Sequence, residues 1–397
     1  ADIDISRGRL AEARSRCMKV LESLDKSTND PLISSLHTKL GIISFYETKY
    51  DDATQYFLEA YHILERYGDK TKLIAPLLNL GNAYSVRHDY DNALISWSHA
   101  LRYAEDVGNL HQQGQICNNL GIAEYNQGHY ENALQNYLKG IDIFERLGNS
   151  PGLALCMSNI GEVYLVRSEY EKALESWEKC LDTYTHIDDA HGLAETHNHL
   201  SQLYLIFERS DIARDHLRKS RQIIEDSNLE AKWPIYYLCC STLALAEKNF
   251  IDAEKYVLLA KERFQHIGDD TNYCRLLLVG GRLHRQLGHP KESADYFTDA
   301  LRKSVDLKLP LLEAEALMEL GVESRTRDLA FEKKTLIYLK EAYDLIEHET
   351  VNDITWKIGY EIGKEYSSRG LGLKSKEFFV KAKHVLLYLG SLYTRNS

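Results

Sequence analysis

Residues 80–100 read LGNAYSVRHDYDNALISWSHA, and residues 160–180 read IGEVYLVRSEYEKALESWEKC. The two stretches share their small and aromatic positions, which recur along most of the chain every 40 residues. The recurring small residues are Gly41, Gly81, Gly121, Gly161, Gly281 and Gly321 in one set, and Ala53, Ala93, Ala133, Ala173, Ala213 and Ala253 in another. Such a period predicts stacked units that build a long binding surface and leave no natural place for a catalytic cavity.

The period divides the chain into blocks. They are a half repeat at 1–30 that holds only a second helix, seven units at 31–310, two longer and more degenerate units at 311–352 and 353–392, and a tail at 393–397. The interval from Gly321 to Gly363 is 42 residues, so we expect two extra residues in the turn at 326–330.

Each block has the apolar spacing of two helices joined by a short polar turn. In one block the first helix is lined by Ile116, Leu120, Ala123 and Tyr125, and the second by Ala133, Leu134, Tyr137, Ile141 and Phe144. Residues that tolerate a left-handed backbone are expected to end the second helices, at Gly68, Gly108, Gly148, Asp188, Asn228, Gly268 and Gly390. Pro76 lies deeper in its first helix, where its missing N–H predicts a shortened or bent helix.

The composition is that of an ordinary water-soluble protein, with 44% hydrophobic and 27% charged residues. No apolar run approaches the roughly 20 residues that a membrane span needs. A net charge of −11 argues against nucleic-acid partners, which are held mainly by clustered Lys and Arg. Seven cysteines without a C-x-x-C pair predict reduced packing thiols in a cytoplasmic protein.

In its small and aromatic positions the chain resembles the tetratricopeptide repeat family. The residues that carry the resemblance are Leu80, Gly81, Tyr84, Tyr90, Ala93, Trp97 and Ala100, and again Ile160, Gly161, Tyr164, Tyr170, Ala173 and Trp177. The family unit usually has about 34 residues, so this chain is similar to the longer-helix variant of kinesin light chain, Pins-type adaptors and bacterial signalling regulators. The chain also resembles peptide-pheromone receptors of the Rap and PlcR type, although its sequence has no helix-turn-helix segment. Ser201 and Ser241 depart from the pattern by replacing the marker glycine.

The resemblance implies an all-α, right-handed superhelix of nine complete helical hairpins and a leading half. It also implies that a protein or peptide ligand binds along a concave groove lined by the first helices. The side chains expected on that groove are Asn79, Asn82, Gln115, Asn118, Asn119, Asn126, Asn159, Glu162, Glu195, Asn198 and Gln202. A carboxamide offers both a donor and an acceptor, so a ladder such as Asn79, Asn119 and Asn159 could bind a peptide backbone.

Two interpretations of these amides stay open, because they could instead hydrogen-bond the neighbouring repeat and fix the superhelix. Four arginines further along the groove stripe also have two interpretations, as ligand-binding residues or as solvated surface residues. They are Arg275, Arg282, Arg285 and Arg325. As ligand-binding residues they predict a basic half of the groove, suited to an acidic side chain or a terminal carboxylate. As solvated surface residues they would bind nothing.

We expect no catalytic residue, metal ion or cofactor. His197 and His199 are two positions apart on a helix and so lie on different faces. Gly280 and Gly281 belong to the repeat marker and lack the strand, loop and helix that cradle a phosphate.

Three classes of function follow from these patterns. The first is a non-enzymatic scaffold that holds one partner peptide. The second is a ligand-sensing region of a larger transcription regulator, cyclase or kinase, which the start of the chain within a repeat favours. The third, an enzyme on a helical-repeat scaffold, has no motif in its support. Self-association through exposed terminal repeats is a separate expectation, because an apolar end can stack on another copy.

Overall fold

The computed structural model describes residues 9–24, 31–325, 332–346 and 353–394. These residues form nineteen α-helices, one short 3-10 helix and no strand, which confirms the all-α prediction. The earlier helices are α2 (Leu10–Ser23), α3 (Pro31–Tyr46), α4 (Tyr50–Tyr67), α5 (Lys70–Val86), α6 (Tyr90–Asp106), α7 (Leu110–Asn126), α8 (Tyr130–Leu147), α9 (Ser150–Val166) and α10 (Tyr170–His186). The later ones are α11 (Ala190–Ile206), α12 (Ser210–Asp226), the 3-10 helix η1 (Glu230–Lys232), α13 (Trp233–Ala246), α14 (Phe250–Ile267), α15 (Asp270–Gln286), α16 (Pro290–Asp306), α17 (Pro310–Ser324), α18 (Glu332–Ile346), α19 (Asp353–Ser368) and α20 (Gly372–Thr394).

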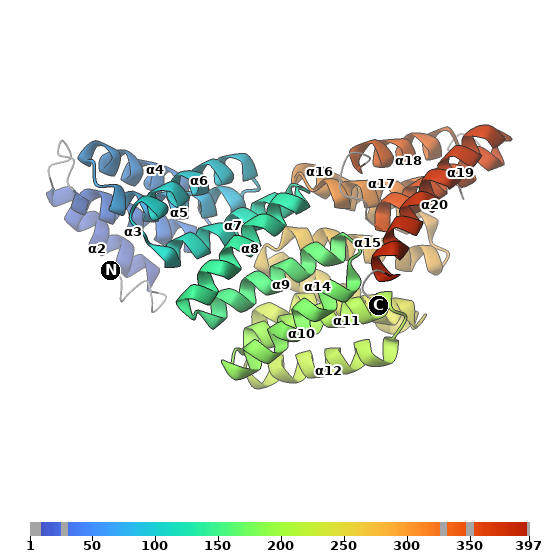
Figure 1. The fold of residues 1–397 in the computed structure, drawn as a ribbon, viewed down its shortest axis with the longest axis horizontal. Helices are drawn as coiled ribbons and strands as arrows, with labels where there is room; N and C mark the ends of the chain where they lie inside the picture. The colour runs from blue at the N-terminus through green and yellow to red at the C-terminus, as the bar shows by residue number, and fades with distance from the viewer. Residues whose placement is uncertain (1–8, 25–30, 326–331, 347–352, 395–397) are drawn as a thin grey trace. The chain divides into compact units, whose positions relative to one another are not determined.

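The chain divides into two compact units. The first comprises Ala1–Tyr125 and Glu131–Leu153, and the second comprises Asn126–Tyr130 and Ala154–Ser397. Within each unit consecutive helices pack as pairs, such as α5 with α6 in the first and α11 with α12 in the second (Figure 1). The first helix of a pair also packs against the second helix of the pair before it, as α5 does against α4.

The repeated glycine makes room for an aromatic ring from the second helix of its own pair. A Cβ atom added to Gly81 would lie 2.3 Å from Nε1 of Trp97, and one added to Gly161 would lie 2.4 Å from Nε1 of Trp177. The indole of Trp97 donates a hydrogen bond to the carbonyl oxygen of Leu78 at 3.1 Å. Only glycine fits at this position, because the ring occupies the space that a Cβ atom would need.

The two repeats without the glycine compensate with a smaller partner. Ser201 is followed sixteen positions later by Leu217, and Ser241 by Val257, both of which are buried. The hydroxyl of Ser201 donates to the carbonyl oxygen of Asn198 at 2.8 Å, so the buried oxygen atom is satisfied. The helices of these repeats have ordinary lengths, so the departure from the family pattern leaves the hairpin intact.

Two series of left-handed residues break the chain between helices. Between pairs they are Gly68, Gly108, Gly148, Asp188, Asn228 and Gly268, which confirms the expected helix ends there, and also Lys308, which was not predicted. Within pairs they are Thr48, His88, Gly128, Ser168, Glu208, Lys248, Gly288 and Gly370. The expectation for Gly390 is wrong, because α20 runs through it to Thr394. Pro76 does not shorten α5, which has 17 residues like α7 and α9.

All seven cysteines are free and buried, as the sequence predicts for packing thiols. Cys180 shows why they suit a core position, since its Sγ donates to the carbonyl oxygen of Ala154 at 3.4 Å. Burial raises the pKa of the Cys180 thiol to about 12, so it stays protonated and inert. The turn at 326–330, where two extra residues are expected, lies outside the described residues. Gly321 contacts Leu339, eighteen positions later, instead of a residue sixteen positions later as in the earlier repeats.

Candidate functional site

Side chains on successive first helices contact one another at a spacing of 37 residues. This spacing is one helical turn less than the repeat, so each contact joins two neighbouring repeats. We call these side chains the first-helix row. In the first unit it contains Asn82 and Asn119, and in the second it contains Glu162, His199, Gln202, Cys239, Arg282 and Glu319.

The side chains predicted to bind a ligand lie on first helices, except that of Arg325, which directly follows α17. Gln115 is exposed, Asn118 and Asn198 are buried, and the others are half-buried, namely Asn79 and Asn82 on α5, Asn119 and Asn126 on α7, Asn159 and Glu162 on α9, Glu195 and Gln202 on α11, and Arg275 and Arg282 on α15. Half-buried amides can be reached by a ligand and still be held in place by their neighbours. The structure therefore brings the predicted residues onto one kind of helix, at the expected repeat interval.

One predicted pair of amides is joined directly. Nδ2 of Asn119 donates to Oδ1 of Asn82 at 3.1 Å, which links α7 to α5. Each amide keeps a second donor or acceptor beyond this bond. Gln202 makes a similar link between repeats, since its Nε2 lies 3.1 Å from Sγ of Cys239 on α13. Holding the neighbouring repeat is thus one role of these amides, and binding a ligand is proposed below.

A cluster of charged and imidazole groups lies on α9, α11 and η1. Nε2 of His199 lies 3.5 Å from Oε1 of Glu162 and 3.9 Å from Oε1 of Glu195. The other carboxylate oxygen of Glu195 accepts a hydrogen bond from Nζ of Lys232 at 2.5 Å. The ring of His199 stacks on Trp177 with centroids 5.0 Å apart. Burial disfavours the charged form of Glu195, but the ammonium of Lys232 and the nearby imidazoles of His199 and His191 together outweigh it and hold the pKa of Glu195 below its usual value.

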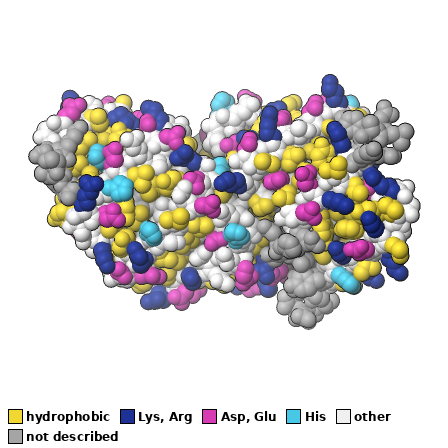
Figure 2. All heavy atoms as spheres, turned by 90° about the horizontal axis from the view of Figure 1, so that it is seen from above, with side chains coloured by type: hydrophobic (Ala, Val, Ile, Leu, Met, Phe, Trp, Pro, Cys, Tyr) yellow, Lys and Arg dark blue, Asp and Glu magenta, His cyan; other side chains and the backbone are white. Residues whose placement is uncertain are grey.

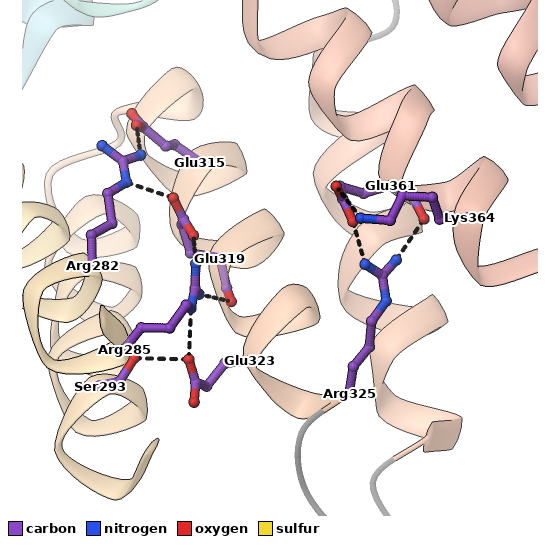
Figure 3. A network of polar contacts seen from close by, with 9 residues as sticks. All are labelled: Arg282, Arg285, Ser293, Glu315, Glu319, Glu323, Arg325, Glu361 and Lys364. Atoms are coloured by element: carbon purple, nitrogen blue, oxygen red, sulfur yellow. Dashed lines mark hydrogen bonds and ion pairs between the residues drawn. The ribbon is translucent and has the colours of Figure 1, made fainter. Parts of the chain in front are cut away.

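The arginines of α15 are paired with glutamates of the next first helix, α17. Arg282 contacts Glu315, and its Nε donates to Glu319 at 2.6 Å (Figure 3). Arg285 donates to Glu319 at 2.6 Å and to Glu323 at 2.8 Å. The two buried carboxylates, Glu319 and Glu323, are only 6% and 2% exposed.

The next repeat forms the same contacts with its own arginine. Arg325 contacts Glu361 (Figure 3). Its Nε also donates to Glu365 at 3.1 Å. Arg325 also donates to the carbonyl oxygen of Glu361, as Arg285 does to that of Glu319. The contact of an arginine with two glutamates of the next first helix therefore occurs in both repeats.

These ion pairs change the predicted character of this part of the row. Around α15, two guanidinium groups face three carboxylates, those of Glu315, Glu319 and Glu323, so the cluster is not basic. Sequence reasoning missed the three glutamates, although they follow the arginines by 33 to 38 positions and so carry the repeat's contact spacing. On the face seen in Figure 2, basic and acidic side chains are likewise interspersed.

A hollow of about 620 Å³ lies away from the first-helix row, on α6, α7 and α8. Most of its lining comes from the second helices, and it includes Leu101, Glu105, Leu138, Lys139, Asp142 and Arg146. The described residues contain no group of three His, Cys, Asp or Glu side chains placed to hold a metal ion. None of the described helices combines the length and the apolar character that crossing a bilayer requires.

Several solved structures of Rap proteins share the fold of this chain. A Rap protein complexed with Competence and Sporulation Factor matches with a TM-score of 0.61 at 10% identity, covering 91% of this chain and 100% of that one. The apo form of RapI matches with a TM-score of 0.58 at 17% identity, covering 69% of this chain and 98% of that one. The Rap conjugation gene regulator of plasmid pLS20, in complex with the Phr* peptide, matches with a TM-score of 0.57 at 15% identity, covering 70% and 76%. At these identities the likeness concerns the fold alone.

No curated protein sequence matches the chain. Residues 73–146 and 153–226 match the family model of the tetratricopeptide repeat. Both stretches contain the contact between glycine and an aromatic ring, and the same contact recurs outside them at Gly41 with Phe57 and at Gly281 with Phe297. Residues 73–146 and 153–226 are therefore tetratricopeptide repeats, and helical pairs on either side of them repeat the same packing contact.

Proposed function

We propose that this chain is a non-enzymatic scaffold that holds an extended peptide or partner segment on the first helices of its repeats. The observation that carries the proposal is the recurrence of half-buried amides on successive first helices, at Asn79, Asn119 and Asn159. An extended peptide repeats its own N–H and C=O groups, so a series of carboxamides suits its backbone. In this proposal the protein acts inside the cell and without a nucleic-acid or membrane partner.

The solved relatives support a peptide as the ligand. Two of them are described in complex with a peptide or factor, the Rap protein with Competence and Sporulation Factor and the pLS20 regulator with Phr*. Those ligands belong to those proteins, and the identity of the ligand here is open. Self-association through the terminal repeats stays a prediction, which light scattering at increasing protein concentration would test.

A double substitution tests the proposed role of the amides. Each net hydrogen bond contributes about 0.5 to 1.5 kcal/mol, so Asn119→Ala with Asn159→Ala should weaken binding by about tenfold or more. The probe is a fluorescent hexapeptide library in which each pool fixes one residue at one position. Gln222→Ala, which removes an exposed amide from second helix α12, is the matched control. Unchanged binding by a folded double variant would refute the assignment.

A further inference from the structure

The cluster around His199 carries a surplus of negative charge. Two carboxylates, Glu162 and Glu195, face one ammonium group, Lys232, when His199 is counted as neutral. The side chain of Glu195 is 43% exposed and that of Glu162 is 28% exposed, so a ligand can reach both. The arginines of α15, by contrast, are already matched by three carboxylates. The charges of the row therefore favour a positively charged ligand group near α9 and α11.

A cation of the chain itself already occupies this position. Lys232 ends η1, a 3-10 turn that precedes α13, whereas the neighbouring first helices α11 and α15 have no such turn before them. Its Nζ lies 2.5 Å from Oε2 of Glu195, and only 18% of its side chain is exposed. The structure thus shows that this carboxylate can hold an ammonium group. A ligand cation of the same chemistry could replace Lys232 without leaving Glu195 unpaired.

Polar groups beside the carboxylates are left without hydrogen bonds. Asn198, one residue before His199 on α11, is 1% exposed, and neither of its amide atoms has a partner among the described residues. Nε2 of His199 is also buried and makes no hydrogen bond within that part of the chain. An unsatisfied buried polar group costs about 1 to 3 kcal/mol, so a water molecule or a ligand group that reached these atoms would be stabilised by them.

We propose that Glu162 and Glu195 bind a cationic group of the peptide ligand, which displaces Lys232 from Glu195. This proposal rests on the proposed function and adds the chemistry of the ligand to it. The cation is a lysine or arginine side chain or the amino terminus of the peptide, since all three donate charged N–H groups to a carboxylate. Lys232 then acts as an internal competitor that lowers affinity for every cationic ligand.

The experiment uses the hexapeptide pools with the intact chain. Pools that fix Lys or Arg are compared with pools that fix Gln or Glu at the same position, each with a free and with an acetylated amino terminus. The expected result is that pools fixing Lys or Arg bind about tenfold more tightly than those fixing Gln. A preference that disappears on acetylation, and not on exchange of Lys for Gln, identifies the amino terminus as the cation.

Three variants identify the residues. Glu162→Gln with Glu195→Gln should remove the preference for a cation while leaving the Gln pools unchanged. Lys232→Met should tighten binding of the cationic pools by about tenfold, because Glu195 then has no internal partner. The controls are Glu178→Gln on α10 and Lys291→Met on α16, both exposed residues of second helices. Far-UV circular dichroism checks that each variant is folded.

The outcomes separate this inference from the proposed function. Binding that depends on Asn119 and Asn159 but ignores charge, or that favours the Glu pools, overturns the inference alone. Loss of the cation preference in the double Gln variant, together with the gain in Lys232→Met, supports it. Absence of binding by every pool overturns the proposed function and the inference with it.

Discussion

Trp177 and Gly161 fit together so closely that no side chain can be added between them. A Cβ atom at Gly161 would lie 2.4 Å from Nε1 of Trp177, whose indole also donates to the carbonyl oxygen of Ser158 at 3.1 Å. Gly161→Ala should therefore lower the free energy of unfolding by about 2 kcal/mol, because the ring must leave its place. Urea unfolding followed by far-UV circular dichroism measures the change.

A compensating variant tests the cause. Gly161→Ser combined with Trp177→Leu copies the natural pair Ser201 and Leu217 and should be less destabilising than Gly161→Ser alone. If the double variant is no more stable than the single one, the close fit of ring and glycine is not what the glycine provides.

A buried histidine, His197, beside the half-buried His216 predicts loss of stability in acid. Nδ1 of His197 lies 2.9 Å from Nδ1 of His216. Burial, followed by the nearby His216, lowers the pKa of His197 to about 4. Folding favours the neutral form of His197. Its contribution to the free energy of unfolding is therefore fully present above the unfolded pKa of about 6.5, and it is lost as the pH falls from 6.5 towards 4. We expect a loss of about 2 to 3 kcal/mol, measured by urea unfolding across this range.

The matched variants for this effect are His197→Leu and His186→Gln. His197→Leu should flatten the pH dependence between 6.5 and 4, since it removes the group that resists protonation. His186 is exposed on α10, so its substitution should leave the pH dependence unchanged. An equally steep loss of stability in His197→Leu would assign the effect to other groups.

The contact between Arg285 and Glu319 predicts a large cost when the arginine is removed. Arg285→Met leaves two buried carboxylates, Glu319 and Glu323, without this partner and should destabilise the protein by about 3 kcal/mol at pH 7. Arg302→Met, at a guanidinium that is 73% exposed, should cost less than about 0.5 kcal/mol. Chemical unfolding of both variants compares the two.

The pH dependence of stability in Arg285→Met gives a second test of this contact. Burial disfavours the charged form of Glu319, and the charges of Arg282 and Arg285 outweigh it and hold its pKa below the usual value. Without Arg285 the carboxylate is easier to protonate, so the penalty in Arg285→Met should shrink as the pH falls towards 5. A penalty that grows in acid would contradict this account.

The left-handed turns predict opposite effects of two substitutions. Lys248 has φ of 58° within its pair, and Gly288 has φ of 77° at the equivalent position one repeat later. Lys248→Gly should stabilise the protein by up to about 1 kcal/mol, and Gly288→Ala should destabilise it by about 1 kcal/mol. Thermal unfolding of both variants measures this. Equal signs for the two changes would show that backbone conformation does not decide the outcome.

Much of the fold could be predicted because small and large residues recur at fixed positions of the repeat. The glycine positions, the aromatic residues sixteen positions later and the left-handed ends at Asp188 and Asn228 follow from packing and backbone sterics within one unit. The prediction for Gly390 was wrong because a glycine at the repeat interval does not by itself end a helix. In the described chain α20 continues through Gly390 to Thr394. Within one repeat, the rules of side-chain packing and backbone conformation were sufficient.

Contacts between repeats were harder to predict. The arginines of α15 suggested a basic surface because their partners, such as Glu319, lie 37 positions away. The sequence shows which residues are charged, but it does not show which residue of the next first helix each of them contacts. The same reason hid the link between Glu195 and Lys232, which also spans 37 positions. A search for opposite charges at the repeat length minus one turn would have found both pairs.

The longer interval near the end of the array shows how its architecture can vary. Arg285 meets glutamates 34 and 38 positions later, and Arg325 meets equivalent ones 36 and 40 positions later, so two added residues have left the lateral pairing intact. The interval from Gly321 to Leu339, the residue that an added Cβ atom would meet, is likewise 18 residues instead of 16. A connector of this protein can accordingly be two residues longer while the ion pairs that tie neighbouring first helices together are kept.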